Sequence, residues 1–206
     1  MWPHPDIVKK LHKSNHENAF DEKGFSNLGF YCDLQSLRSE DAITWSVFGT
    51  LYYFSKEQQR QFVNSLLKII GISNHVSDCS IQLWTRIAHT DTLGSGGPEL
   101  DFQIVADNVV VFGEAKWRSK VSNNQGKQRN KSQLELREQY FRDFGSKIFP
   151  KASARIVLVV GLDPRLKSFP TSSNYRYVTW RKICEETDHP MKDQLLKYYE
   201  WKEKHG

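Results

Sequence analysis

LGSGGPELDFQIVADNVVVFGEAKWRS, residues 93–119, is the stretch that decides the fold. After a glycine- and proline-rich turn, residues 102–107 (FQIVAD) are mostly β-branched or apolar, which is typical of a strand. Residues 109–117 (VVVFGEAKW) form a second such segment, and Asp107 and Asn108 between them tolerate the left-handed backbone angles of a tight hairpin turn. Because the second segment is nearly all apolar up to Gly113, we expect it to be buried on both faces in the middle of a sheet.

Three charged residues interrupt this apolar hairpin: Asp101 at its start, and Glu114 and Lys116 at its end. Positions 114 and 116 are two apart, so on a strand their side chains point to the same side. Asp101 and Glu114 are about equally far from the turn, so an antiparallel hairpin pairs them as neighbours. Buried charges are costly unless they are paired or bind a metal. Two carboxylates and a backbone carbonyl suit Mg²⁺ or Mn²⁺, and an adjacent lysine can orient a water or offset charge on a phosphate.

The pattern PELD (98–101) followed by EAK (114–116) resembles the PD-(D/E)XK signature of the restriction-endonuclease-like nucleases. One additional residue separates Pro98 from Asp101, which we take as the aspartate of the signature. Glu99 is the alternative acid, although it lies in the turn before the strand. The placement of the motif on a hairpin after a glycine-rich turn makes the resemblance more specific than the short motif alone.

The resemblance implies an α/β fold with a restriction-endonuclease-like mixed β-sheet core flanked by helices, the core elements following the order αβββαβ. It implies that Asp101, Glu114 and the carbonyl of Ala115 hold Mg²⁺, for which Mn²⁺ can substitute. It also implies that Lys116 is catalytic. These are expectations for the structure to test.

A helix is expected to begin at Ser39, a good N-cap residue, with Glu40 and Asp41 at the positive end of the helix dipole. Its apolar stripe comprises Ile43, Val47, Leu51 and Phe54. Glu40 falls on that stripe, so its carboxylate should approach the core, whereas Asp41 is rotated away by about 100°. In the nucleases that this chain resembles, the first core helix often supplies an acid to the metal site, and Glu40 matches that role. Helix capping alone is the alternative.

A second helix is expected at residues 132–148, with an apolar stripe of Leu136, Tyr140, Phe144 and Ile148. Gln133 is polar but falls in line with this stripe. In several nucleases of this resemblance, a glutamine on the corresponding helix reaches the site, so Gln133 is expected to bond a metal-associated water or a phosphate oxygen. A helix-start residue that bonds backbone groups is the alternative. Arg137, one turn further on, is expected to face DNA.

A basic segment without apolar period follows the second strand of the hairpin. Its charged residues are Arg118, Lys120, Lys127, Arg129 and Lys131. Charge runs are usually solvated loops. Because this one leaves from the end of the strand that carries the motif, we expect it to contact the phosphates of DNA.

The remaining elements follow from the spacing of apolar residues. Helices are expected at 56–70, 180–187 and 190–204, and strands at 79–88, 154–161 and 175–179. The helix at 132–148 connects two strands as a right-handed crossover, which implies that they are parallel. Residues 1–36 show no sustained period, so they are expected to be an irregular N-terminal extension with a short helix at 5–13. The extension and the core at 37–206 would form one nuclease-like domain, 1–206.

Composition bounds the class of protein. The 206 residues are 26% charged and 13% aromatic, which is an ordinary globular balance, and no apolar run approaches the ~20 residues of a membrane span. The first residues lack the apolar segment of a secretory signal. Cys32, Cys79 and Cys184 lack metal-ligand spacing, and His189 and the other histidines are expected to be at the surface or incidental. Together these features predict reduced thiols and a cytoplasmic location. The net charge of +5 is compatible with a polyanionic partner.

The sequence therefore predicts a Mg²⁺-dependent deoxyribonuclease that hydrolyses the phosphodiester bonds of double-stranded DNA. SED (39–41) followed by Thr44 and Trp45 resembles the opening of some restriction endonucleases, which favours a role in defence against foreign DNA. A repair or junction-resolving nuclease, a catalytically inactive nucleic-acid-binding module, and a purely structural set of ion pairs are the alternatives. A homodimer is one arrangement that would reach both strands of a duplex.

Overall fold

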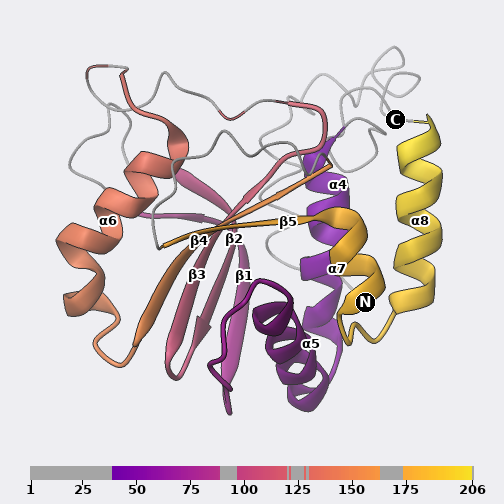
Figure 1. The fold of residues 1–206 in the computed structure, drawn as a ribbon, viewed down its shortest axis with the longest axis horizontal. Coiled ribbons are helices and arrows are strands. Elements are labelled where there is room, and N and C mark those ends of the chain that lie inside the picture. Colours follow the sequence, from indigo (N-terminus) through magenta and orange to yellow (C-terminus); the bar gives the residue numbers. More distant parts are fainter. Residues whose placement is uncertain are drawn as a thin grey trace, which may run out of the picture.

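A five-stranded mixed sheet lies between helices in the computed structural model, which describes residues 39–88, 97–119, 121, 128, 130–162 and 174–205 (Figure 1). The expected α/β class is therefore confirmed. The predictions for residues 1–36 lie outside the described residues. Within the described part of the chain, no helix is long and apolar enough to cross a membrane.

The elements before the crossover are the helix α4 (Glu40–Thr44), the π-helix η2 (Trp45–Gly49), the 3₁₀-helix η3 (Thr50–Tyr53), the helix α5 (Lys56–Ile69) and the strands β1 (Cys79–Arg86), β2 (Glu99–Ala106) and β3 (Val109–Ala115). The remaining elements are α6 (Gln133–Ile148), β4 (Ala154–Gly161), β5 (Tyr175–Thr179), α7 (Trp180–Glu186) and α8 (Lys192–His205). If the helices before β1 are counted together, the order from α4 to β4 is αβββαβ.

The strands lie side by side in chain order, β1-β2-β3-β4-β5. The β2–β3 hairpin turns at Asp107 and Asn108 as expected, and β1 is antiparallel to β2. β4 is parallel to both β3 and β5, which confirms the parallel crossover through α6. Every residue of β3 is buried, because β3 is the central strand and helices cover both of its faces.

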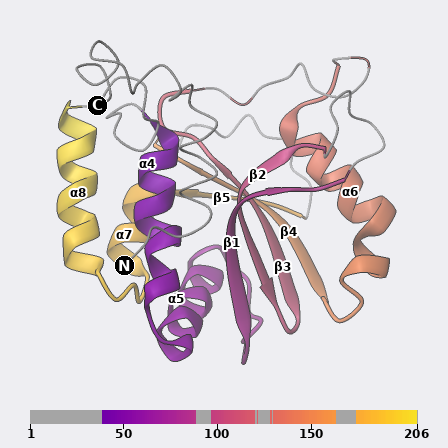
Figure 2. The ribbon, with the colours of Figure 1, turned by 180° about the vertical axis from the view of Figure 1, so that it is seen from behind.

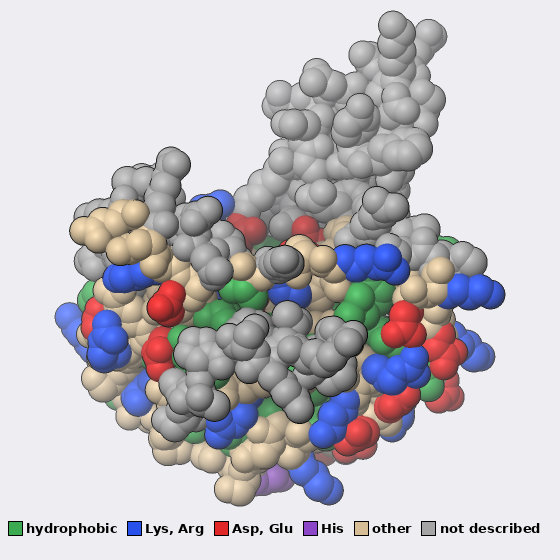
Figure 3. Space-filling view, turned by 45° about the horizontal axis from the view of Figure 1, so that its top comes forward, with side chains coloured by type: hydrophobic (Ala, Val, Ile, Leu, Met, Phe, Trp, Pro, Cys, Tyr) green, Lys and Arg blue, Asp and Glu red, His purple; other side chains and the backbone are tan. Residues whose placement is uncertain are grey.

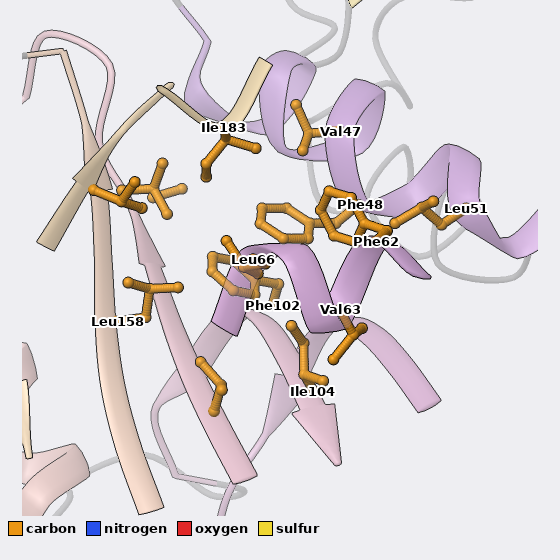
Figure 4. Close-up of a cluster of buried hydrophobic side chains, with 14 of the residues drawn as sticks. Val47, Phe48, Leu51, Phe62, Val63, Leu66, Phe102, Ile104, Leu158 and Ile183 are labelled. Atoms are coloured by element: carbon orange, nitrogen blue, oxygen red, sulfur yellow. The ribbon is translucent and has the colours of Figure 1, made fainter. Parts of the chain in front are cut away.

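The helices form one layer on each face of the sheet. Figures 1 and 2 show α6 alone on one face and α4, α5, α7 and α8 on the other. On the α6 face, Phe112 of β3 stacks on Phe141 with ring centroids 4.1 Å apart. On the other face, Phe102 of β2 stacks on Phe48 at 3.9 Å, within the larger cluster shown in Figure 4.

Gly113 makes room for this stacking. A Cβ atom at position 113 would lie 2.2 Å from the ring of Phe102, so only glycine allows that ring to cover the strand here. The next residue of β3 is Glu114, whose side chain leaves the opposite face of the strand, toward Arg137 of α6.

The expected helix at 39–54 is divided into three kinds of helical turn. Ser39 caps it as predicted, since its side chain accepts a hydrogen bond from the N–H of Asp41. Ile43, Val47 and Leu51 of the predicted stripe are buried. The middle of the segment is a π-helix, in which the N–H of Thr50 bonds the carbonyl of Trp45.

His189, which was expected to be at the surface or incidental, is instead a buried residue that contacts this π-helix. It is 4% exposed, and its Nε2–H donates to the carbonyl of Val47 in the π-helix at 3.0 Å. Its Nδ1 accepts a hydrogen bond of 2.9 Å from the N–H of Met191. Burial lowers the pKa of His189 to about 4. The histidine is thus a neutral structural residue that joins η2 to the segment before α8.

Helix α6 has Ser132 as its N-cap, which forms a capping box with Glu135. Leu136 and Tyr140 of the predicted stripe are buried, but Ile148 at its end is 48% exposed. Arg137 and Phe141, which lie beside that stripe, are buried as well. The buried face is therefore displaced toward Arg137 and Phe141, and the stacking of Phe141 on Phe112 helps to set it.

Trp84 of β1 has a φ of +52°, which interrupts the alternation of side chains along the strand. Leu83 and Trp84 are consequently both buried, and the strand ends at Arg86. The Trp84 indole N–H donates to Asp41 of α4 at 3.1 Å, and its ring stacks on Trp45 with centroids 6.2 Å apart. These contacts hold a backbone conformation that bulky residues rarely adopt.

Candidate active site

Asp101 and Glu114 are brought opposite one another at the open end of the β2–β3 hairpin. In the register of these strands Phe102 faces Gly113, so the next pair toward the open end is Asp101 with Glu114. Asp101 Oδ2 accepts a hydrogen bond of 2.7 Å from the N–H of Ala115. The two carboxylates that the sequence predicted as neighbours are therefore neighbours at the carboxyl end of β3.

Glu114 is fully buried between two cations. Its Oε1 lies 2.6 Å from Lys116 Nζ, and its Oε2 pairs with Nη2 of Arg137, which reaches it from α6. Arg137 is 1% exposed and also donates to the carbonyl of Glu99 at 3.2 Å. This position differs from the DNA-facing one expected for Arg137, because α6 turns position 137 toward the sheet.

Glu40 approaches the same lysine from the other side of the sheet. Its Oε1 lies 3.2 Å from Lys116 Nζ, while its Oε2 accepts hydrogen bonds from the N–H of Trp117 at 3.2 Å and from Ser119 Oγ at 2.6 Å. The first core helix therefore does bring an acid to the predicted site. Since Ser39 supplies the helix cap, capping does not account for this placement of the Glu40 carboxylate.

These contacts define a charge cluster made of Glu40, Asp101, Glu114, Lys116 and Arg137. Burial and the charge of Glu114 raise the pKa of Asp101 to about 8, against the opposing influence of Arg137, Lys116 and the N–H of Ala115. Burial lowers the pKa of Lys116, but Glu114, Asp101 and Glu40 outweigh that effect and raise it above that of a free lysine. Lys116 is therefore a protonated cation at neutral pH.

The donor atoms of the cluster suit a hard divalent ion, although they are not arranged as a ready metal cage. Among the described residues, no group of three or more His, Cys, Asp and Glu side chains could hold a metal ion. Asp101, Glu114 and the Ala115 carbonyl still offer the oxygen ligands that Mg²⁺ and Mn²⁺ prefer. The raised pKa of Asp101 reflects its burial and, after that, the neighbouring charge of Glu114, and a divalent ion would offset both effects. Such an ion would have to compete with the cations that now contact Glu114.

The other predicted site residues lie around this cluster or outside the described residues. Gln133 is the first residue of α6 and is partly buried, and its role at the site stays a prediction. Arg118 is exposed directly after the cluster strand, and Lys131 Nζ donates to Gln139 at 2.7 Å. The predicted phosphate contacts Lys120, Lys127 and Arg129 lie outside the described residues.

Lys and Arg side chains are dispersed among Asp and Glu on the face shown in Figure 3. Among the described residues visible there, they do not merge into one continuous basic surface. The predicted contact with DNA phosphates consequently depends on the segment after β3, most of which is outside the described residues.

Sequence reasoning missed the ion pair of Arg137 and the burial of Lys202. Arg137 follows Gln133 by four residues, so both polar side chains lie on the same face of the helix. This repeat of polar residues is the signal that could have indicated a buried polar contact. Lys202 follows Leu195 and Tyr199 on the inward stripe of α8, and its Nζ lies 4.7 Å from the centre of the Trp117 ring. Burial, with a contribution from Arg118, lowers the pKa of Lys202 to about 8.

Trp180 anchors the backbone at the cluster. It is the first residue of α7 and is fully buried, and its indole N–H donates to the carbonyl of Lys116 at 2.8 Å. The N–H of Lys116 in turn donates to the carbonyl of Val160 in β4 at 2.7 Å. Both backbone groups of Lys116 are therefore fixed by neighbouring elements.

Comparison of this chain with protein-family models, with curated proteins and with solved structures finds no match. The functional argument accordingly depends on the geometry and charge of the cluster, together with the fold that positions it.

Proposed function

We propose that this protein is a metal-dependent endonuclease with a restriction-endonuclease-like fold, and that it hydrolyses phosphodiester bonds in double-stranded DNA. The observation that carries the proposal is the convergence of Asp101, Glu114 and Lys116 at the carboxyl end of β3, with Glu114 Oε1 and Lys116 Nζ 2.6 Å apart. The order αβββαβ around a mixed sheet also favours it. In sheets of this kind, ligands commonly bind beyond the carboxyl ends of the parallel strands, where this cluster lies.

Asp101, Glu114 and the Ala115 carbonyl would hold Mg²⁺ or Mn²⁺. A divalent ion at these oxygens would polarise a phosphate oxygen and make a bound water more acidic. Lys116 is positively charged, so it would orient the attacking water or stabilise the negative charge that develops on the phosphate. Glu40 would position Lys116, because its Oε1 contacts the ammonium group and its Oε2 is held by Trp117 and Ser119.

Defence against foreign DNA by restriction is the biological role that we favour, with repair or junction resolution as the alternative. Arg118 and Lys131, together with Lys120, Lys127 and Arg129, would contact the DNA backbone. A homodimer would allow cleavage of both strands of the duplex.

A plasmid-nicking assay tests the proposal. The purified protein is incubated with supercoiled DNA and Mg²⁺ or Mn²⁺, beside Lys116→Ala and the control Lys151→Ala, which changes an exposed lysine after α6. We expect metal-dependent nicking by the wild type and by the control, and a loss of about 100-fold or more in Lys116→Ala. Equal nicking by all three proteins would reject Lys116 as a catalytic residue.

A structural role for the cluster is the second candidate, because both oxygens of Glu114 already face cations. In that case Lys116→Ala would lower the free energy of unfolding by about 3–5 kcal/mol, since it leaves a buried carboxylate with one partner fewer. The wild type would then show no metal-dependent nicking. Measuring unfolding and nicking on the same preparations therefore separates the two candidates.

A further inference from the structure

The ion pair of Arg137, rather than its hydrogen bonds, explains why this side chain is buried. Its Nη2 contacts Glu114 Oε2 and donates to the carbonyl of Glu99 at 3.2 Å. Its Nε and Nη1 are buried, and neither has a hydrogen-bond partner among the described residues. Burying a donor without a partner is unfavourable. The attraction between the guanidinium and the Glu114 carboxylate is therefore the interaction that holds this side chain in place.

The position of Arg137 is also the position that a metal ion would need. Glu114 has two oxygens, and Lys116 contacts Oε1 while Arg137 contacts Oε2. A divalent ion bound to Glu114 would lie close to one or both of these cations, and the repulsion between like charges makes them compete for the carboxylate. Lys116 is held by Glu40 as well as by Glu114, and both of its backbone groups are bonded. Among the described residues Arg137 forms a close ion pair with Glu114 alone, although its charge also acts on Asp101, so we take it as the cation that is easier to displace.

Charge balance also favours the replacement of Arg137 by a divalent ion. The cluster contains the three carboxyl groups of Glu40, Asp101 and Glu114 and the two cations Lys116 and Arg137. A divalent ion added beside both cations would leave an excess of positive charge in a buried site. A divalent ion that replaces Arg137 leaves three negative and three positive charges, and a buried cluster is least costly when its charges are paired.

We propose that Arg137 is a built-in counter-cation that holds Glu114 in the metal-free protein and competes with the divalent ion for that carboxylate. This inference rests on the proposed function, since it concerns the same metal site. Metal binding releases the guanidinium beside the place where the phosphodiester would bind. Its five N–H donors are then available for the bidentate contacts that arginine makes with phosphate oxygens.

Calorimetric titration with Mn²⁺ tests the competition without depending on catalysis. Arg137→Met removes the charge, Arg137→Lys keeps it, and Asp101→Asn removes a proposed ligand. Arg155→Met is the matched control: Arg155 also donates to a backbone carbonyl, that of Phe149 at 3.0 Å, and its Nε is likewise buried without a partner in the described part of the chain. We expect Arg137→Met to bind Mn²⁺ at least about tenfold more tightly than the wild type. The affinity of Arg155→Met should be unchanged, and that of Arg137→Lys should lie closer to the wild-type value.

The outcomes separate this inference from the proposed function. In one outcome the wild type binds Mn²⁺, Asp101→Asn binds it more weakly, and Arg137→Met binds it no more tightly than the wild type. Arg137 is then not a competitor for Glu114, and the inference is overturned. If neither the wild type nor the variants bind Mn²⁺, the proposed metal site is lost, and the inference is lost with it.

Arginine resonances of the wild type provide a second measurement that does not require Arg137→Met to fold. The Nε–H signal of Arg137, identified by its absence in Arg137→Lys, should shift on addition of Mg²⁺, whereas that of Arg155 should stay in place. An Arg137 signal that is unmoved when Mg²⁺ saturates the protein would overturn the inference.

Discussion

Asp101 is ionised in the charge cluster only at an electrostatic cost. Burial and the neighbouring Glu114 raise its pKa to about 8, whereas an aspartate in an unfolded chain titrates near 4. The folded protein therefore binds more protons than the unfolded chain between these pH values. It follows that the Asp101 contribution makes the free energy of unfolding fall as the pH rises from about 4 to about 8.

Asp101→Asn should remove this dependence in metal-free protein. Asparagine is neutral at every pH and can still accept the hydrogen bond from the Ala115 N–H. We expect the variant to resemble the wild type at pH 5 and to melt higher by roughly 2–4 °C at pH 8, the shift that ~1 kcal/mol gives in a chain of this size. Thermal unfolding in a chelating buffer measures the difference.

Asp143→Asn is the control for this experiment, because Asp143 is exposed and pairs only with its neighbour Arg142 in the described part of the chain. Its melting temperature should follow the wild-type curve across the whole pH range. If Asp101→Asn melts at a lower temperature than the wild type at pH 8, the Asp101 carboxylate of the wild type is ionised and stabilising at that pH.

The β2–β3 hairpin is the element that the sequence predicts most completely. Its turn residues and the apolar runs on either side fix the register, and the register alone places Asp101 opposite Glu114. The helices were harder to predict, because their inward faces depend on what lies on the sheet. The stacking of Phe141 on Phe112 turns α6 so that Arg137 points to Glu114, and no local pattern contains that information.

Gly113→Ala should disrupt the hairpin where the cluster begins. The added methyl group would overlap the Phe102 ring at 2.2 Å, so this ring must move away from Phe48 or β3 must shift. We expect the free energy of unfolding in urea to fall by about 1–3 kcal/mol.

Gly145→Ala is a matched substitution in α6. The closest atom to its added methyl group is Cδ of the flexible Arg155 side chain, which can move aside. Alanine also favours helix by about 1 kcal/mol over glycine. We therefore expect no loss of stability in Gly145→Ala, and an equal loss in both variants would contradict the steric account of Gly113.

At the scale of the whole molecule, the larger core depends on contacts between segments far apart in the chain. His189 shows this most directly, since it donates to the carbonyl of Val47 and its ring lies edge-on to that of Phe62 with centroids 5.3 Å apart. His189 was predicted to be at the surface or incidental because no His or Cys lies at metal-ligand spacing from it, and its actual contacts are distant along the chain. The burial of Lys202 was missed for the same reason, as its contact with Trp117 crosses from α8 to the end of β3.

His189→Ala should destabilise the protein in a way that depends on pH. Because the folded pKa of about 4 lies below the ordinary value of 6.5, His189 contributes stability above pH 6.5 and loses it as the pH falls toward 4. We expect the variant to lose about 2 kcal/mol of unfolding free energy at pH 7, from the cavity and the unpaired Val47 carbonyl. At pH 5 the difference from the wild type should narrow by about 1–2 kcal/mol.

Chemical denaturation of both proteins at the two pH values checks this prediction, with His75→Ala as an exposed control. Differences between variants are the quantity to compare, because Asp101 titrates over the same range with the opposite sign. A gap between His189→Ala and the wild type that is equal at pH 5 and pH 7 would show that folding does not lower the pKa of His189.

The hydrogen bond from Trp180 to the carbonyl of Lys116 gives the cluster an optical reporter of its own. An indole emits at a wavelength and intensity that respond to the field and hydrogen bonding around it. Rearrangement of the charges beside Lys116 would therefore change the fluorescence of this buried tryptophan. Occupancy of the cluster would therefore change the total tryptophan emission, to which the other five tryptophans of the chain also contribute.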